Sequence, residues 1–460
     1  DSFDRNQMPV SGVNPVVKVP EFWKKNLGNG IKAIGTQTTE LPIVTLTLTI
    51  PGGHLLQARD TSKIGLAKMF AAMMNEDTQN YSAEQMQAEL QKLGSSMSVY
   101  SGFDGITLRL QSLTRNLDKS LKLFEEQLLR PKFTEEAFSR IQKQSVEGFK
   151  QRKSQPASIA DDVFPLINYG TTIFGSSQNG TEYTVKNLSL KNVEDYYNNY
   201  MTSRNAKLVV VGDVTENDIL GKLGFLNKLP NKEVKLPPTP AFPKADKTKV
   251  YVIDIPKAAQ TEFRVGAIKD LKYDATGEYY RATLANYPLG GNFNSRVNLN
   301  LRENKGWTYG ARSGFSADKY TGYFAFSSGI RADVTDKALT EVMNEMTNYT
   351  AKGITQEEIA FMQSSLGQRD ALMYETGIQK AGFLDRILEF NLPNNFVDEQ
   401  NKILASISKA DIDKSVKKWM NPETINILLV GDKNKIMPGL SKLGYEIIEL
   451  DVNGNTLPVK

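Results

Sequence analysis

A segment that ends in Val-Gly-Asp occurs twice in the chain, and this repeat limits the possible folds more than any other feature. Residues 189–213 and 408–432 both begin with serine, continue with the apolar spacing of a helix, and end in an apolar run closed by Val-Gly-Asp. The second copy lies 219 residues after the first. Further pairs recur in the same order, namely Gly94 with Gly306, Ser101-Gly102-Phe103 with Ser313-Gly314-Phe315, and Asp118-Lys119 with Asp336-Lys337. Such an ordered series is typical of an internal duplication, so we expect two halves with the same fold.

A proline-rich stretch separates the two halves. Residues 229–244 contain five prolines, at positions 230, 237, 238, 240 and 243. Proline fixes φ and removes a backbone donor, so this composition is typical of an extended, semi-rigid linker. We therefore predict an N-terminal domain over residues 1–235 and a C-terminal domain over residues 236–460.

Strand and helix patterns mix within each half. Residues 43–50 alternate apolar residues with threonine, which indicates a half-buried strand, and further strands are predicted at 107–113, 206–211, 323–328 and 425–430. Residues 62–75 are apolar on nearly every side, as in a buried helix. Capping-box residues open two more helices, at Ser82 with Gln85 and at Thr355 with Glu358. Because the elements follow no strict βαβ rhythm, the pattern favours an α+β fold, with sheet and helices packed as a sandwich in each half.

Composition excludes several classes of function. The 460 residues include no cysteine and one histidine, His54, which excludes thiolate metal sites, a cysteine nucleophile and any two-histidine metal site made by this chain alone. We predict that His54 is structural or lies on the surface. The 56 basic and 52 acidic residues leave a formal charge of +4, which gives no case for nucleic-acid binding. No run reaches the roughly 18 to 20 apolar residues of a membrane span. No Gly-x-Ser-x-Gly elbow, Walker loop or dinucleotide fingerprint is present either.

Residues 65–73 form the most specific motif of the first half. Their sequence, Gly-Leu-Ala-Lys-Met-Phe-Ala-Ala-Met, resembles the Gly-Leu-Ala-His-x-x-Glu-His-Met motif of the pitrilysin-type (inverzincin, insulinase-type) zinc peptidases. Other segments resemble the same family, namely Leu27-Gly28-Asn29-Gly30, Tyr81-Ser82-Ala83-Glu84, Leu93-Gly94 and the Val-Gly-Asp strand. The resemblance covers nearly the whole chain, and it implies a duplicated fold with antiparallel-rich sheets flanked by helices.

The residues that bind zinc in that family are replaced in this chain. In the motif, two histidines at i and i+4 on one helix face bind zinc, and the glutamate between them is the general base. The corresponding residues here are Lys68, Ala71 and Ala72, a cation and two methyl groups, which cannot do this chemistry. The family's third ligand, a glutamate, falls near Glu147 or Gly148, and we interpret Glu147 as an ordinary carboxylate on a helix surface. No metal is therefore expected in this chain.

The second half retains a motif whose side chains donate hydrogen bonds. Residues 289–309 resemble the family's Gly-Gly-x-Phe-x-Ser-Arg-Leu … Leu-Arg-Glu-x-x-Gly-x-x-Tyr. The resemblance implies that Arg302 and Tyr309 reach the zinc site of another half or subunit, where they bind the substrate backbone and the developing oxyanion. A guanidinium and a phenol are suitable donors for that oxygen. The residues alone also allow a structural interpretation, in which Arg302 pairs with Glu303 or a nearby carboxylate and Tyr309 belongs to the core.

Substrate contacts are predicted at two further places. Family peptidases bind a peptide as an added strand on a sheet edge beside the zinc helix. The corresponding segment here is 94–104, where Ser98 and Val99 replace the family's Asn-Ala pair. In the second half, Asn292 and Phe293 belong to the Gly-Gly-x-Phe motif. These four residues are the predicted substrate-binding positions.

A lost zinc motif together with a retained Arg/Tyr pair predicts a subunit or half of a zinc endopeptidase that is not an enzyme on its own. In this hypothesis Arg302 and Tyr309 act on an unfolded or short peptide held by a partner, a homologous subunit or fused half that carries His-x-x-Glu-His. No cofactor is expected in this chain, and zinc is expected in the partner. The alternative is a catalytically inert structural or peptide-binding core protein of the same fold.

The start of the chain bears on its compartment. The first residue is Asp1 and not methionine, and residues 3–23 resemble a connector between domains. We expect a bacterial protein that is periplasmic or otherwise exported, with the cytoplasm as the alternative.

Overall fold

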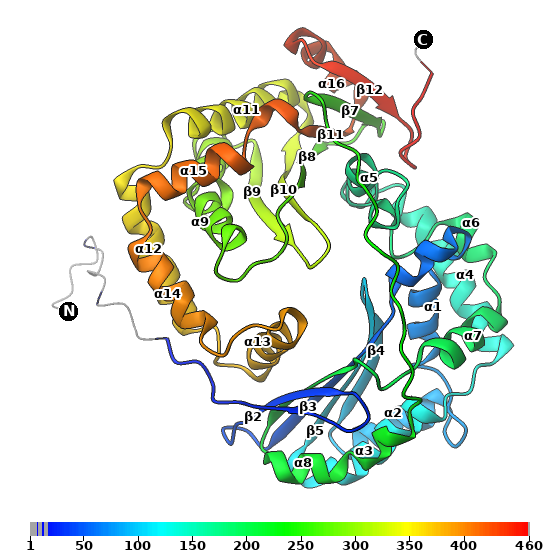
Figure 1. The fold of residues 1–460 in the computed structure, drawn as a ribbon. Helices are drawn as coiled ribbons and strands as arrows, with labels where there is room; N and C mark the ends of the chain where they lie inside the picture. Colours follow the sequence, from blue (N-terminus) through cyan, green and yellow to red (C-terminus); the bar gives the residue numbers. More distant parts are fainter. Residues whose placement is uncertain (1–6, 8–11, 13–16, 459–460) are drawn as a thin grey trace.

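The chain forms two six-stranded sheets, each with helices packed against it, and the two halves lie opposite each other (Figure 1). The computed structural model describes residue 7, residue 12 and residues 17–458. The expected connector at residues 3–23 lies mostly outside these residues. No helix in the described part of the chain is long and apolar enough to cross a membrane.

The first half contributes one sheet and the helices α1 to α8. Its strands are β1 (Trp23–Asn26), β2 (Lys32–Gln37), β3 (Ile43–Pro51), β4 (Ser96–Ser101), β5 (Gly105–Leu113) and β6 (Lys207–Gly212). Its helices are α1 (Leu66–Met73), α2 (Ala83–Lys92), α3 (Leu117–Leu129), α4 (Glu135–Arg152), α5 (Pro156–Tyr169), α6 (Glu182–Lys186), α7 (Leu190–Tyr200) and α8 (Glu216–Lys222). The helix predicted over 62–75 is shorter than expected, because Gly65 has a left-handed φ of 99° and α1 begins only after it.

The second half repeats this pattern. Its strands are β7 (Lys249–Asp254), β8 (Gln260–Lys269), β9 (Thr308–Ala317), β10 (Gly322–Arg331), β11 (Asn426–Gly431) and β12 (Glu446–Leu450). Its helices are α9 (Glu278–Gly290), α10 (Arg296–Asn298), a π-helical turn (Leu299–Asn304), α11 (Thr335–Lys352), α12 (Gln356–Ala371), α13 (Gly377–Phe390), α14 (Phe396–Ser406), α15 (Lys409–Trp419) and α16 (Lys433–Leu440). Both predicted capping boxes form, at Ser82 and at Thr355.

The two sheets share the order of five strands. The first runs β2-β6-β3-β5-β4 and the second β7-β11-β8-β10-β9. In each sheet the first of these pairs is parallel and the following pairs are antiparallel. The sixth strand differs, because β1 pairs with β2 antiparallel whereas β12 pairs with β7 parallel. The shared order confirms the duplicated α+β fold. Residues 230–245 form no helix or strand, and the boundary near residue 235 stays a prediction.

Each sheet is covered on one face by a helix from the other half. Helix α5 of the first half places Val163 in one apolar cluster with Leu428 of β11. Helix α13 of the second half places Leu384 in another cluster with Val209 of β6. The duplicated halves therefore exchange equivalent helices, and the buried apolar surface of one half depends on the presence of the other.

Ion pairs also join the halves. The Lys207 ammonium lies 3.1 Å from the Asp385 carboxylate and contacts Glu389 as well. Lys319 lies 2.7 Å from Asp104 and 2.8 Å from Glu389. Burial raises the pKa of Glu389, but the two lysines outweigh this effect and hold that pKa below its ordinary value. One carboxylate thus connects lysines from both halves.

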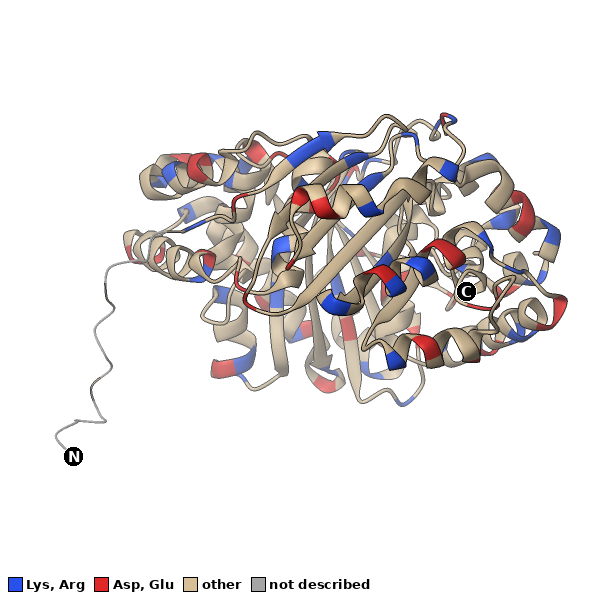
Figure 2. Cartoon of the chain, turned by 90° about the horizontal axis from the view of Figure 1, so that it is seen from below, with Lys and Arg blue, Asp and Glu red and all other residues tan. Residues whose placement is uncertain are grey.

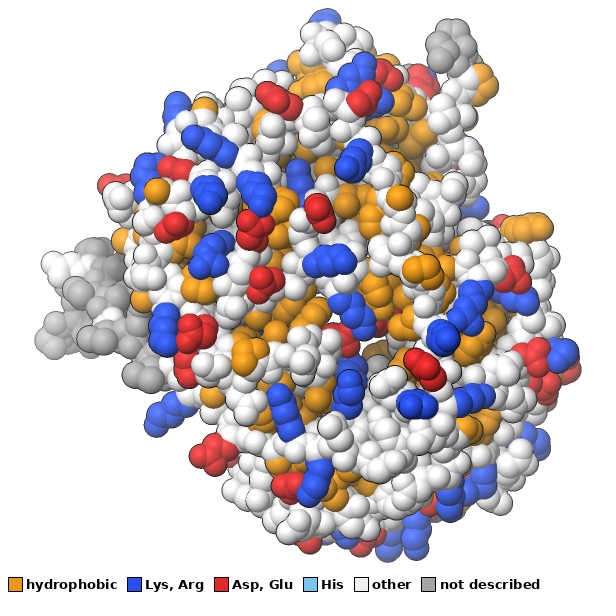
Figure 3. Space-filling model, in the orientation of Figure 1, with side chains coloured by type: hydrophobic (Ala, Val, Ile, Leu, Met, Phe, Trp, Pro, Cys, Tyr) orange, Lys and Arg blue, Asp and Glu red, His pale blue; other side chains and the backbone are white. Residues whose placement is uncertain are grey.

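Charged side chains are spread over the surface. Figure 2 shows both lysine or arginine and aspartate or glutamate residues distributed over the helices of both halves. The face shown in Figure 3 is hollowed near its centre, between the two halves. This distribution agrees with the nearly balanced charge of the sequence.

Candidate functional site

The three zinc-motif positions lie on α1 in the first half. Lys68 is exposed, and its ammonium donates a hydrogen bond to the Asn179 side-chain oxygen. Ala71 is 3% exposed and packs in the core, and Ala72 is partly buried against the same cluster. The motif positions are thus occupied by a hydrogen-bonded lysine and two packed methyl groups.

A cavity of about 190 Å³ lies beside these positions, between α1 and α4. Gly148, and not Glu147, lines it, and Glu147 is exposed as predicted. Arg152 also lines it and pairs with Asp162 at 2.9 Å. Although Lys68 is largely exposed, partial desolvation of its ammonium lowers its pKa, and the Arg152 guanidinium lowers it further, whereas Asp162 opposes this. Cations therefore border the cavity, and no group of three potential metal ligands occurs within the residues that the structure describes.

His54 is structural. Its side chain is 1% exposed, and Nε2 lies 3.1 Å from the Ile173 carbonyl oxygen. Burial lowers the pKa of the imidazole. The ring packs beside Phe103, with 5.7 Å between centroids.

Restoring the motif alone is expected to give only weak zinc binding. The variant Lys68→His/Ala71→Glu/Ala72→His regains two imidazoles and a carboxylate, but no third ligand, because Gly148 is the residue that lines the cavity near the expected position 147 or 148 of that ligand. Adding Gly148→Glu is expected to tighten zinc binding by more than the roughly 10- to 100-fold that outer-sphere partners contribute. Apart from neighbours in its own helix, no atom lies within 4 Å of a Cβ placed at position 148, so a side chain can start there without a clash. Competition with a chromophoric chelator measures both variants, and equal affinities would contradict this role of position 148.

Arg302 lies in the π-helical turn that follows α10. Its guanidinium carbon is 4.6 Å from the centre of the Phe293 ring, and its Nε is 3.3 Å from the Glu303 carboxylate. Both side chains of the Arg302–Glu303 pair are about two-fifths exposed, at 39% and 44%. An ion pair this open to water contributes little to stability. The pairing with Glu303 in the structural interpretation is therefore present, but it does not bury the arginine.

Tyr309 lies near the start of β9, one of the two edge strands of the second sheet. Gly306 makes the preceding turn with a φ of 62°. The Tyr309 side chain is 90% exposed, so the structural interpretation that placed it in the core is wrong. The physical reason is its position, because a residue at the end of an edge strand has no neighbouring strand or helix to cover it.

The remaining residues of the second-half motif have different surroundings. Asn292 donates a hydrogen bond of 2.7 Å to the Tyr287 carbonyl and accepts one of 2.8 Å from the Asn294 amide. Its side chain therefore satisfies backbone groups at the end of α9 and in the loop that follows. Phe293 is 57% exposed beneath the arginine. The structure thus brings Phe293 and Arg302 together and turns Asn292 to the backbone.

The predicted peptide-binding edge is β4, which pairs only with β5. Ser98 is exposed and Val99 is 5% exposed. The Asn75 side chain, just after α1, accepts a hydrogen bond from the Val99 amide at 2.9 Å and donates one to the Val99 carbonyl at 2.8 Å. An added peptide strand would need these same backbone groups. Pairing at Val99 therefore requires Asn75 to move, a constraint that the sequence reasoning missed.

The edge of the second sheet has an equivalent arrangement. The Asn298 side chain accepts a hydrogen bond of 3.0 Å from the Ala311 amide of β9. Asn286 donates one of 2.7 Å to the Ser313 carbonyl. Asparagine side chains thus satisfy backbone groups on the edge strands β4 and β9.

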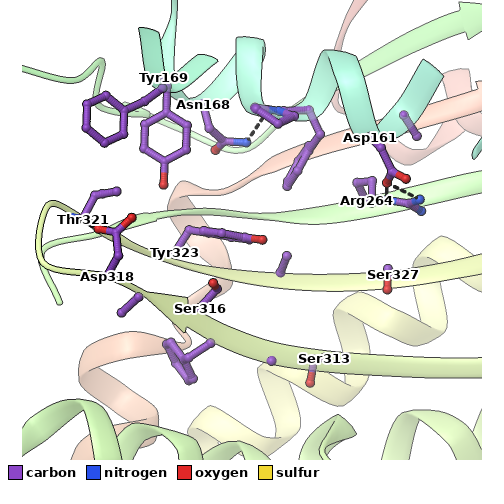
Figure 4. Close-up of a pocket in the computed structure, with 18 of the residues that line it drawn as sticks. Asp161, Asn168, Tyr169, Arg264, Ser313, Ser316, Asp318, Thr321, Tyr323 and Ser327 are labelled. Atoms are coloured by element: carbon purple, nitrogen blue, oxygen red, sulfur yellow. Dashed lines mark hydrogen bonds and ion pairs between the residues drawn. The ribbon is translucent and has the colours of Figure 1, made fainter. Parts of the chain in front are cut away.

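A cavity of about 710 Å³ lies between α5 and strands β8 to β10 (Figure 4). The Tyr169 phenol points toward Asp318 and Thr321 at one end, and Arg264 pairs with Asp161 at 2.9 Å at the other (Figure 4). Burial raises the pKa of Tyr169 to about 12 and raises that of Asp318, although backbone amides donate to the carboxylate. This cavity combines residues from both halves, and the sequence reasoning did not find it.

Two sequence profiles of a single family match consecutive parts of the chain. The profile described as "Insulinase (Peptidase family M16)" matches residues 33–194, and the profile described as "Peptidase M16 inactive domain" matches residues 187–366. The chain belongs to the M16 (insulinase) family. The resemblance of its motifs to the pitrilysin-type peptidases is thereby confirmed, and the inactive-domain profile spans the end of the first half and the first part of the second.

Individual M16 relatives agree with this result. Over 403 residues, the chain is 24% identical to a Helicobacter pylori protein named non-peptidase homolog YmxG, covering 86% of this chain and 90% of that one. Over 197 residues it is 26% identical to the zinc protease PqqE of the same organism, covering 42% and 44% of the two chains. A crystal structure of a peptidase M16 inactive domain from Pseudomonas fluorescens superposes with a TM-score of 0.80 at 23% identity, covering 89% and 98%. The inactive-domain profile and the non-peptidase relative support a non-catalytic chain.

Proposed function

We propose that this M16 chain is the non-catalytic subunit of a zinc endopeptidase assembly. In this assembly Arg302 and Tyr309 serve the zinc site of a partner that carries His-x-x-Glu-His. The exposure of Tyr309, 90% of its side chain, is the observation that carries the proposal. Such a tyrosine contributes little to the core of its own chain, whereas its phenol is a good donor to the oxyanion that forms during peptide hydrolysis.

The surroundings of Arg302 support the same role. Its contact with Glu303 is open to solvent and therefore easily exchanged for a contact with substrate. The Phe293 ring lies against the guanidinium at 4.6 Å and limits the orientations of its plane. The two donors lie seven residues apart across the Gly306 turn, at the exposed end of β9. A peptide bound at the partner's zinc would receive hydrogen bonds from both.

Reconstitution tests this proposal. The purified chain is mixed with an M16 protein that carries His-x-x-Glu-His and comes from the same genome, and the mixture is analysed by gel filtration and by cleavage of fluorogenic peptides. We expect the chain alone to cleave nothing, a complex of the two proteins to elute earlier than either one, and the complex to cleave faster than the partner alone. A partner that reaches full activity without this chain would contradict the proposal.

A second candidate is a structural or peptide-binding M16 protein without any part in catalysis. The hydrogen bonds of Asn75, Asn286 and Asn298 to β4 and β9 favour its structural form, because they occupy backbone groups that a bound peptide strand would use. In this case the complex would form, but its cleavage rate would equal that of the partner. The same reconstitution therefore separates the two candidates.

A further inference from the structure

A cavity of about 510 Å³ lies where the linker between the halves crosses the second sheet. It is lined by residues 242–247, which end the linker and follow it, by β7, by the end of β8 and by the last turn of α5. Five lysines belong to its lining, Lys244, Lys247, Lys249, Lys269 and Lys272, and we name the cavity the lysine pocket after them. These lysines come from the linker, from β7, and from β8 and the loop that follows it, so the fold alone brings them together.

Acidic residues balance only part of this charge. Two aspartates, Asp246 and Asp270, also line the lysine pocket. Asp246 pairs with Lys249 at 3.1 Å, and Glu446 pairs with Lys247 at 2.8 Å. In each of these pairs the acid is more than two-fifths exposed, so water screens the attraction. The lining therefore keeps an excess of positive charge.

Lys269 is the least solvated of the lysines without a partner. It is the last residue of β8, and burial lowers the pKa of its ammonium with no charged group acting on it. No carboxylate of the described residues forms an ion pair with Lys244, Lys269 or Lys272. A buried ammonium without an anion is unfavourable, and pairing it offsets part of the loss of hydration. Lys269 is half-buried and belongs to the lining of a cavity large enough for a ligand.

We propose that the lysine pocket binds a small, multiply charged anion, a polyphosphate or a polycarboxylate, with Lys269 in direct contact. The volume lies within the roughly 300–1,000 Å³ that small-molecule sites occupy. Lysine ammonium groups bind phosphate and carboxylate oxygens as point charges, and three of them without ion pairs suit more than one negative charge. The bound anion would connect the linker to the end of β8, which stabilises the folded protein. This site is independent of the role proposed for Arg302 and Tyr309.

Calorimetric titration of the full chain at fixed ionic strength tests the proposal. The probes are inorganic triphosphate and citrate. Inorganic phosphate serves as the reference with a single phosphate group, and a glutamate-rich peptide tests whether an acidic protein segment binds instead. We expect saturable 1:1 binding of triphosphate or citrate, and whichever binds tighter assigns the ligand chemistry. Lys269→Met is expected to weaken that binding about tenfold to hundredfold, the effect of losing one hydrogen bond to a charged group.

Lys24→Met is the matched control. Burial lowers the pKa of Lys24 as well, but this residue lies on β1 of the other sheet, so its loss should leave the affinity unchanged. Lys244→Met/Lys272→Met, at two exposed positions, tests the pocket without touching a buried side chain and should also weaken binding. Undiminished binding by both pocket variants, an equal loss in Lys24→Met, or binding of the acidic peptide alone would overturn the proposal.

Discussion

Replacing Arg302 with alanine is expected to slow peptide cleavage by the reconstituted complex about 10²–10³-fold, the usual effect of losing one oxyanion donor. The complex itself should still form, because the Arg302 side chain is 39% exposed and its pairing with Glu303 adds little to stability. Arg302→Lys should also be slow, since an ammonium lacks the planar fork of the guanidinium. The cleavage rate at a saturating concentration of the partner measures the loss of activity, and gel filtration of the same sample measures complex formation.

Tyr309→Phe extends the experiment to the second donor. It removes only the phenolic oxygen from a side chain that packs against little of its own chain. Its effect combined with Arg302→Ala should be less than additive, because both groups serve the same transition-state oxygen. Arg331→Ala is the control, an exposed arginine at the end of β10 that pairs with Asp333 at 2.6 Å, and it should leave the rate unchanged. Near-normal turnover in both Arg302→Ala and Tyr309→Phe would contradict a catalytic role for this pair and would support the structural candidate.

Leu384→Ala is expected to lower the free energy of unfolding by about 2–5 kcal/mol. Leu384 is fully buried on α13, in the apolar cluster that this helix forms with the first sheet. The truncation leaves a cavity at a contact between the two halves, where neither side can collapse without moving a helix or a strand. Urea unfolding followed by circular dichroism measures the change.

Ile378→Ala on the same helix provides the comparison. Ile378 is 70% exposed in the first turn of α13, so its truncation should change the free energy of unfolding by no more than about 0.5 kcal/mol. Equal effects of the two variants would show that α13 is not held by its packing on the first sheet.

The duplication could be predicted from the sequence, and the exchange of helices could not. The repeated Val-Gly-Asp strands and the capping boxes at Ser82 and Thr355 are formed by residues close together in the sequence, so the sequence alone indicates them. The apolar cluster of Val163 and Leu428 joins residues far apart in the chain, as does that of Leu384 and Val209. The spacing of apolar residues indicates that a helix has a buried face, but it does not indicate which sheet that face covers.

The candidate sites divide in the same way. The interpretation of Lys68, Ala71 and Ala72 as replaced zinc-motif positions rests on residue identity within one helix turn, which is local information in the sequence. The bonds of Asn75 to Val99 were not predictable, because an asparagine after a helix more often only ends it. The lysine pocket draws its residues from separate segments, and nothing in the order of the sequence marks Lys269 as lacking a partner.

The exchange of α5 and α13 also determines how such a chain could be divided. A cut anywhere between residues 230 and 245 would leave each fragment with a helix seated on the other fragment's sheet, so nicked protein should stay associated. Either fragment produced alone would present to water the apolar sheet face that its missing neighbour covers, and would be prone to aggregate. Genes for the two fragments could therefore be separated only if both products were synthesised together and folded as one.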